Sequence, residues 1–179
     1  MKGVGNLVSA LALLTAGCAE MTTSSGTGDT ATAELRNADN QIVGTATFTQ
    51  VTGGVRIVLE AQGLPPGDKG VHVHSVGRCD PPAFTSARDH FNPQGKQHGL
   101  LNAAGPHAGD LSNIAISPDG TGRLETFNER ISLGSGSTTL FDADGSALIV
   151  HAAPDDFKTD PTGNSGARLA CGVITKSPR

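Results

Sequence analysis

The chain has 179 residues, a length that suits one domain with a sizeable core. Its 24 glycines and 10 prolines, with no tryptophan or tyrosine, favour an all-β domain with many turns. The 13 basic residues stand against 17 acidic ones and form no basic run, which argues against nucleic-acid binding.

The N-terminus reads as an export signal. Lys2 is followed by a short apolar run over 8–16, too short to span a bilayer comfortably, and then by small residues. We therefore expect a signal peptide over residues 1–17, a flexible polar tether over 18–30 and the folded domain over 31–179. Signal removal takes away only Lys2 among the charges, which leaves 12 basic against 17 acidic residues, a net charge of −5.

The break falls immediately before a cysteine, in "LLTAGC". This resembles a bacterial lipoprotein signal, which implies that Cys18 becomes a lipid-bearing N-terminus. The alternative is an ordinary signal with a nearby cleavage site. Cys18 favours the lipoprotein, because it would otherwise be an unpaired thiol in an exported protein. The expected location is the periplasm or cell envelope, with membrane contact through that lipid alone.

From Ala31 onward the pattern is strand and turn. Residues 31–37 and 41–50 flank a turn at 38–40, and 55–63 show alternation with Val55, Ile57 and Leu59 on one face. Residues 70–76 predict the next strand. Strands at roughly ten-residue spacing indicate a sandwich or barrel.

Two long loops interrupt this pattern. Residues 77–110 are rich in Gly, Pro, Asn and Asp, and loops of such length inside a domain are usually functional or disordered. Strands resume over 111–127 and 146–152. A second loop over 153–167 leads to a last strand at 168–175.

The histidines suggest a metal site. His72 and His74 are two residues apart on a presumed strand, so they share a face. Taken alone, metal ligands and ordinary histidines fit this pair about equally well. The first long loop adds three histidines and an aspartate, a set suited to tetrahedral zinc, and one more histidine ends an apolar strand: His90, His98, His107, Asp110 and His151.

At this point the chain resembles the copper/zinc superoxide dismutases. The matching stretches are "GVHVHSVG", "HFNP", "KQHG", "HAGDL", "LIVHAAPDDF" and "TGNSGARLACGVI". They run in order from about Gly70 to the end of the domain. The resemblance implies an all-β fold, an eight-stranded Greek-key β-sandwich or barrel with two long functional loops.

The resemblance also implies two metal cofactors, copper and zinc. The expected copper ligands are His72, His74, His90 and His151. The expected zinc ligands are His90, His98, His107 and Asp110. His90 would bridge both ions, which requires its ring to lose both protons, and zinc on one nitrogen makes that feasible. Copper would change oxidation state, whereas zinc cannot and would serve as scaffold and charge.

Further roles are implied by the same resemblance. Asp155 would accept hydrogen bonds from His72 on the copper side and from His98 on the zinc side. Arg168 would attract and orient superoxide with its planar cation. Cys79 and Cys171 match the family disulfide, which export permits. Chain-entropy reasoning puts the value of such a bond at about 4–5 kcal/mol.

The implied activity is the disproportionation of superoxide to dioxygen and hydrogen peroxide, with His90 also carrying a proton. Attraction of the anion would come from the metals, Arg168 and Lys158. The chain departs from the family in two places: Ala152 and Ala153 replace charged residues, and Arg88-Asp89 replaces small residues before His90. The first departure predicts weak steering. The second leaves open a local ion pair or added charge beside the site.

Two alternatives belong to other classes. A non-enzymatic metal-binding domain is disfavoured because every ligand position is filled. A copper carrier is disfavoured because carriers tend to use Met and Cys for Cu(I), and Met1 and Met21 both precede the domain. Quaternary structure stays open between a monomer and a homodimer.

Overall fold

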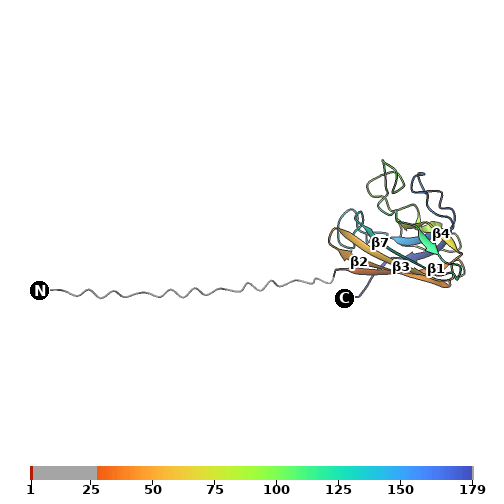
Figure 1. The fold of residues 1–179 in the computed structure, drawn as a ribbon, viewed down its shortest axis with the longest axis horizontal. Coiled ribbons are helices and arrows are strands. Elements are labelled where there is room, and N and C mark those ends of the chain that lie inside the picture. Colours follow the sequence, from red (N-terminus) through yellow and green to blue (C-terminus); the bar gives the residue numbers. More distant parts are fainter. Residues whose placement is uncertain (2–27, 179) are drawn as a thin grey trace.

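The computed structural model describes residue 1 and residues 28–178, with residues 2–27 and 179 drawn in grey in Figure 1. The predictions of a signal peptide and of a lipid on Cys18 fall on residues 2–27 and so lie outside the described residues. The first strand begins at Thr30, one residue before the expected start of the domain. In the described part of the chain, no helix is long and apolar enough to cross a membrane.

The described residues form ten β-strands and one short 3-10 helix, η1. The elements are β1 Thr30–Asn37, β2 Ile42–Val51, β3 Gly54–Ala61, β4 Gly67–Lys69, β5 Val71–His74, η1 Thr85–Ala87, β6 Ile114–Ile116, β7 Gly122–Asn128, β8 Ala147–His151, β9 Arg168–Val173 and β10 Thr175–Lys176.

Strands β1 to β3 form because their side chains alternate between the interior and solvent. Phe48 on β2 lies opposite Ile57 on β3 in the antiparallel ladder, and both are buried. On the outer face of the same sheet, Arg56 pairs with Glu125 of β7. One face of the sheet therefore packs in the core while the other faces solvent, which is common for antiparallel sheets.

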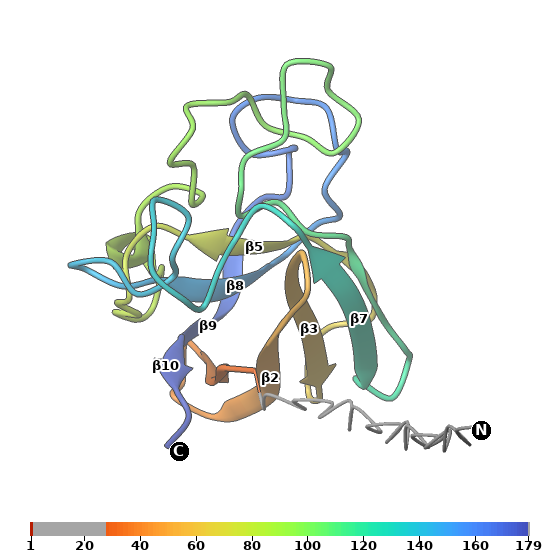
Figure 2. The same cartoon turned by 90° about the vertical axis from the view of Figure 1, so that its left-hand side faces the viewer.

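The strands follow the order β4-β6-β7-β3-β2-β1-β9-β8-β5, and β10 adds to β1. The two strands at the ends of this path, β4 and β5, are consecutive in the chain, with only Gly70 between them. The chain thus passes from one edge to the other, and the sheet curls into a nearly closed barrel (Figure 2). A Cβ on Gly70 would lie 2.9 Å from the Ser165 Cβ, so a side chain does not fit at this crossing.

This architecture confirms the expected all-β barrel. Eight strands were expected, and ten occur in the described residues because β4 and β10 are short pieces of three and two residues. The predicted strand over 70–76 is shorter than expected, since β5 ends at His74.

The two long loops lie together on one side of the barrel. Residues 75–113 connect β5 to β6, strands that lie far apart in the sheet order, and residues 152–167 connect β8 to β9. Both loops rise above the same end of the strands (Figures 1 and 2). They are joined by hydrogen bonds, with the Leu101 N–H donating to the Phe157 carbonyl at 2.9 Å and the His98 N–H donating to Asp160 Oδ1 at 2.5 Å. The first of these loops holds three of the six histidines, His90, His98 and His107.

Candidate metal centre

Strand β5 places two histidines beneath the loops. All four residues of β5 are buried. Val71 and Val73 belong to the barrel core, so the alternation of the strand directs His72 and His74 to the opposite side. The neighbouring strand β8 pairs His74 with Ala147 and His72 with Ile149, and it ends at His151. The ring of His151 therefore lies next to those of His72 and His74.

Four histidines form the first donor group. One ligand atom from each lies within 4.8 Å of the others, and the members are His72, His74, His90 and His151. An isolated bridge between the backbones of His74 and His90 holds the loop histidine against β5. The Nε2 atoms of His74 and His151 are 3.4 Å apart. Four buried nitrogens at such spacing can converge on a single ion.

Each ring in this group is oriented through its other nitrogen. His74 Nδ1 donates to the Arg88 carbonyl at 2.8 Å, and His151 Nδ1 donates to the Gly166 carbonyl at 3.2 Å. His72 Nε2 lies 2.7 Å from Asp155 Oδ2. Such bonds fix the tautomer of a ligating histidine and leave the opposite nitrogen free.

Two of the free nitrogens have no partner. His72 Nδ1 and His90 Nε2 are buried and form no hydrogen bond with any described residue. Leaving a buried polar atom unpaired is costly, so an orphaned nitrogen requires an explanation. A metal ion at the centre of the group would satisfy both atoms.

The rings of the first group are neutral near neutral pH. Burial, with smaller repulsion from His72, lowers the pKa of His151 to about 3. Burial likewise lowers the pKa of His90 to about 4. Burial also holds the pKa of His74 well below its usual value. Since a metal ligand must offer a lone pair, the neutral ring is the required form.

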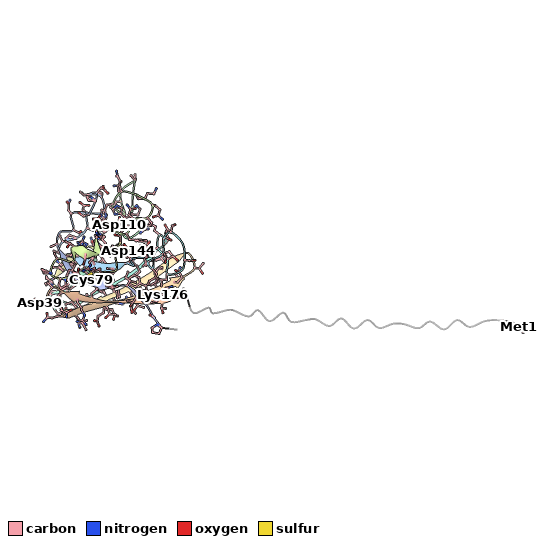
Figure 3. All side chains as sticks on the ribbon, turned by 180° about the vertical axis from the view of Figure 1, so that it is seen from behind. Met1, Asp39, Cys79, Asp110, Asp144 and Lys176 are labelled. Atoms are coloured by element: carbon pink, nitrogen blue, oxygen red, sulfur yellow. A yellow bond between two sulfur atoms is a disulfide. The ribbon has the colours of Figure 1, made fainter. Side chains whose placement is uncertain are left out.

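The second group surrounds Asp110, a fully buried carboxylate that is labelled in Figure 3. Asp110 Oδ1 lies 3.0 Å from His98 Nδ1, 3.1 Å from His90 Nδ1 and 3.4 Å from His107 Nδ1. Asp110 Oδ2 accepts the backbone N–H groups of His107 and Gly99, each at 2.9 Å. Although burial opposes ionisation, these contacts hold the pKa of Asp110 well below its usual range.

The distances between donor atoms and the directions in which the rings face select different members for the second group. One donor atom from each of four residues lies within 4.8 Å of the rest, namely His72, His90, His98 and Asp110. His107 is outside that set, yet its Nδ1 is also 3.4 Å from His90 Nδ1. His107 suits the second group better than His72, because three imidazole Nδ1 atoms, including that of His107, face the same carboxylate oxygen, whereas His72 Nε2 faces Asp155.

Asp155 connects the two groups. Its Oδ2 faces His72, and its Oδ1 lies 3.0 Å from His98 Nε2 and accepts the Phe157 N–H at 2.6 Å. Burial alone would lower the pKa of His98, but its bonds to Asp110 and Asp155 raise it to about 9. One carboxylate thus orients a ring on each side of the centre.

The residues fit a copper and a zinc ion. Four imidazole nitrogens suit copper, and three imidazoles with one carboxylate suit tetrahedral zinc. The buried neutral rings of the first group, together with the orphaned nitrogens of His72 and His90, are what a copper ion requires. His90 is a member of both groups, and its Nδ1 lies 3.1 Å from Asp110 Oδ1.

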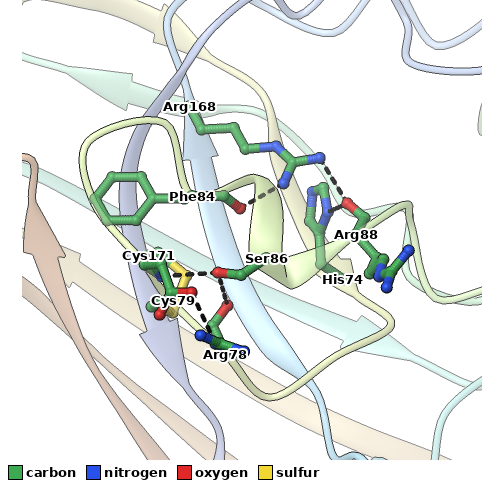
Figure 4. Close-up of a disulfide and its surroundings, with 9 residues drawn as sticks. His74, Arg78, Cys79, Phe84, Ser86, Arg88, Arg168 and Cys171 are labelled. Atoms are coloured by element: carbon green, nitrogen blue, oxygen red, sulfur yellow. Dashed lines mark hydrogen bonds and ion pairs between the residues drawn. A yellow bond between two sulfur atoms is a disulfide. The ribbon is translucent and has the colours of Figure 1, made fainter.

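Arg168 begins β9 at the edge of the first group. Its guanidinium donates to the carbonyls of Phe84 and Arg88, both at 2.6 Å (Figure 4). The Arg88 carbonyl also accepts His74 Nδ1, so one oxygen orients both the arginine and a donor ring. The guanidinium is therefore held in place by the segment that precedes His90.

A disulfide holds that segment against β9. Cys79 and Cys171 are bonded, with Cα atoms 5.6 Å apart across a sequence separation of 92 residues. This confirms the predicted pairing. The bond links the start of the first loop to Cys171, which follows Arg168 by three residues on β9 (Figure 4). It therefore keeps the loop segment whose carbonyl groups accept from the guanidinium close to β9.

An open channel of about 860 Å³ leads to the first group. His74, His90, His151 and Arg168 lie in its wall. Lys96 also lines the channel, whereas Lys158, the second cation expected from the sequence, does not. The wall also contains four aspartates, Asp89, Asp142, Asp144 and Asp160.

Several supporting residues were not found from the sequence. Asn113 holds the backbone of Asp155 from both sides, donating to its carbonyl at 3.0 Å and accepting its N–H at 2.9 Å. Arg130 donates to the Asp110 carbonyl at 3.0 Å. Asn113 follows the "HAGDL" stretch closely, but Arg130 is 20 residues from its partner, and no local pattern marks it.

Arg88 and Asp89 do not form an ion pair with each other in the described residues. Arg88 has φ 62° and ψ −146°, a conformation that favours glycine. Its carbonyl, rather than its charge, contributes to the site. Asp89 lines the channel instead. Of the two readings of this pair, the structure supports added charge beside the site.

Comparisons with known proteins agree with this geometry. The family model described as copper/zinc superoxide dismutase (SODC) matches residues 42–174. Superoxide dismutase (Cu-Zn) 2 of Aquifex aeolicus is 48% identical over 144 residues, which cover 79% of this chain and 84% of the relative. Superoxide dismutase (Cu-Zn) of Caulobacter vibrioides is 44% identical over 147 residues, with coverage of 80% and 84%.

Solved structures agree as well. The crystal structure of a SOD-like protein from Bacillus subtilis superposes with a TM-score of 0.76 at 38% identity, covering 79% of this chain and 95% of that one. The clock protein EA4 gives a TM-score of 0.70 at 38% identity, with coverage of 83% and 94%.

Proposed function

Because the chain belongs to the copper/zinc superoxide dismutase family, we propose that its two donor groups hold one copper and one zinc ion that share His90. The enzyme disproportionates superoxide, converting two superoxide anions and two protons to dioxygen and hydrogen peroxide. Its cofactors are copper and zinc. The observation that carries the division of ligands is the pair of orphaned nitrogens, His72 Nδ1 and His90 Nε2, in the buried four-histidine group.

In this proposal copper is held by His72, His74, His90 and His151, and zinc by His90, His98, His107 and Asp110. The ring orientations support the division. His74 and His151 use Nδ1 for backbone carbonyls, which leaves Nε2 for copper. His90, His98 and His107 turn Nδ1 towards Asp110, which leaves those atoms for zinc.

Bound copper would supply a one-electron couple that superoxide can first reduce and then reoxidise. Arg168 would bind the anion with a guanidinium that two carbonyls hold in a fixed direction. His90 Nε2 would take a proton when it is not engaged by copper and give it to the reduced product. The channel brings the anion to both residues, because Arg168 and His90 share its wall.

Asp155 would act as a positioning residue. It touches His72 on one side and His98 on the other, so it would set the tautomer of a copper ligand and of a zinc ligand together.

We also propose that the chain is exported. Bacterial members of the family are generally exported to the periplasm. The signal peptide over 1–17, a lipid on Cys18, the tether over 18–30 and the domain over 31–179 stay part of this proposal, as does the open choice between monomer and homodimer. The Cys79–Cys171 bond supports export, because such bonds persist in oxidising compartments.

The ligand division is tested by His151→Ala, with His107→Ala as its counterpart. His151→Ala should abolish dismutation and lower the copper content while zinc stays near one per chain. His107→Ala should lower the zinc content first. Metal content by mass spectrometry of the purified proteins, measured together with superoxide decay, gives both results.

Equal loss of both metals in His151→Ala would show that the ligand division is wrong. A wild-type protein that carries one copper and one zinc per chain but does not accelerate superoxide decay would contradict the enzymatic function itself. The disulfide-bonded fold of each variant can be checked by circular dichroism, so that a loss of metal is not confused with unfolding.

A further inference from the structure

We propose that Asp89 weakens the attraction of the channel for superoxide by opposing the charge of Arg168. This inference rests on the proposed function and concerns its rate. Asp89 does not touch the reacting atoms and is therefore not a catalytic residue. It acts through the field at the site.

The wall of the channel carries an excess of acidic groups. The charged side chains that line it, apart from the histidines, are Asp89, Asp142, Asp144, Asp160, Lys96 and Arg168. Four negative charges thus face two positive ones around the path of a monovalent anion. Bound copper and zinc ions would add positive charge beside the histidines, whereas the six charged side chains of the wall sum to a net negative charge. Charge along the approach to a site changes the rate at which a charged substrate meets it.

Asp89 is the wall aspartate whose charge acts on Arg168. It directly precedes His90, and its backbone is fixed because its carbonyl accepts the Ser75 N–H at 2.9 Å. Asp89 and Arg168 are both wall residues, and burial lowers the pKa of Arg168 while the charge of Asp89 opposes that lowering. The charge of Asp89 therefore acts on the guanidinium of Arg168. Because no ion pair joins Asp89 to a cation in the described residues, the negative charge is not cancelled by direct contact.

The other wall aspartates differ from Asp89 in their contacts. Asp160 Oδ1 accepts the His98 N–H, and Asp142 Oδ1 accepts the Gly145 N–H at 3.0 Å, so both carboxylates also organise loop backbone. Asp144 is exposed on the loop between β7 and β8. A charge change at Asp89 therefore removes one negative charge without removing a side-chain hydrogen bond that any described residue makes to it.

The test neutralises this charge in the protein loaded with copper and zinc. In Asp89→Asn at low ionic strength, azide, a small monovalent anion followed through the copper absorption band, should bind about two- to threefold more tightly. The rate constant for superoxide decay should rise by a similar factor. Both ratios to wild type should approach one as added salt shortens the screening length below about 10 Å. Azide binding is an equilibrium readout that does not depend on turnover.

Asp119→Asn is the matched control. It removes the same charge from the turn before β7, at the opposite end of that strand from Asn128, whose side chain donates to the Ala108 carbonyl in the first long loop. Asp119→Asn should leave azide affinity and rate unchanged. Asp144→Asn, which removes a charge from the same wall, should shift both readouts in the direction of Asp89→Asn.

Azide affinity in Asp89→Asn equal to that of Asp119→Asn would overturn the inference, even if wild-type dismutation is confirmed. An effect of Asp89→Asn that persists unchanged at high salt would also overturn it, because a field effect must be screened. A failure of the proposed function would look different, since the wild-type protein would not accelerate superoxide decay at all.

Discussion

The barrel and its two loops are stabilised by different kinds of interaction. In the barrel, backbone ladders and alternating apolar side chains bury a core that includes Phe48, Ile57 and Leu59. In the loops, the buried carboxylates of Asp110 and Asp155 form hydrogen bonds with histidine rings and backbone N–H groups. Burying apolar side chains stabilises the barrel without any bound ligand, whereas burying imidazoles with unpaired nitrogens is costly unless a metal ion binds them. The barrel is therefore expected to fold without metals, and the loops to gain their final order from them.

A substitution in the barrel core should have the largest effect, lowering the free energy of unfolding without changing metal binding by the loops. Phe48 is fully buried on β2, far in sequence from both loops. Phe48→Ala should lower the free energy of unfolding by about 3–5 kcal/mol, because it deletes a large buried side chain and leaves a cavity. Copper and zinc per folded chain should stay unchanged. Urea denaturation and metal analysis measure the two quantities.

Phe127→Ala is the control for that prediction, since Phe127 is half exposed on β7 of the same barrel. Its effect on stability should stay within about 0.5 kcal/mol. If Phe48→Ala emptied the metal sites of folded molecules, the separation between barrel and loops would be wrong.

The reverse experiment alters the loops alone. Asp155→Asn keeps the shape of the side chain but replaces one oxygen by an N–H₂ group, which cannot accept from His72 and His98 together. Metal affinity should fall by about 10–100-fold. Competition with a chelator of known affinity measures this for each ion, and unfolding of the metal-free protein should change far less.

Asp156→Asn is its control. The Asp156 carboxylate is exposed and bonds only within the second loop, to the backbone N–H groups of Lys158 and Thr159 and to side chains of Thr159 and Asn164. These hydrogen bonds lower its pKa to about 2. Its replacement should leave both metals bound. Equal losses in the two variants would mean that loop order in general, and not the contact with the two rings, determines metal affinity.

The smallest expected effect lies at the junction of the two regions. Arg88 occupies a backbone conformation that glycine adopts without strain, and its carbonyl orients His74 and Arg168. Arg88→Gly should raise the free energy of unfolding by about 0.5–1 kcal/mol, the relief of strain less the entropy that glycine adds to the unfolded chain. Urea denaturation at fixed metal content measures it.

Arg88→Ala removes the same side-chain charge and keeps the strained backbone. It should therefore not stabilise the protein. A gain in Arg88→Ala equal to that in Arg88→Gly would assign the effect to the arginine side chain and not to its φ angle.

The sequence by itself determined the barrel and most of the candidate ligands. The alternation of Val55, Ile57 and Leu59 fixed a strand face, and the spacing of His72 and His74 fixed a shared direction, because the period of a strand is local. The remaining histidines could be grouped only through the family resemblance, since a loop without period gives no direction to its side chains.

Tertiary structure alone decided how these residues meet. Arg168 receives its two carbonyl partners from residues 80 and 84 positions away, and Lys96 rather than Lys158 enters the channel wall. For Arg88-Asp89 the sequence left two readings open, and the structure decided between them by placing Asp89 in that wall. The crossing of the chain at Gly70 and the bond between Cys79 and Cys171 bring segments together that are distant in sequence, and no short window of sequence contains such contacts.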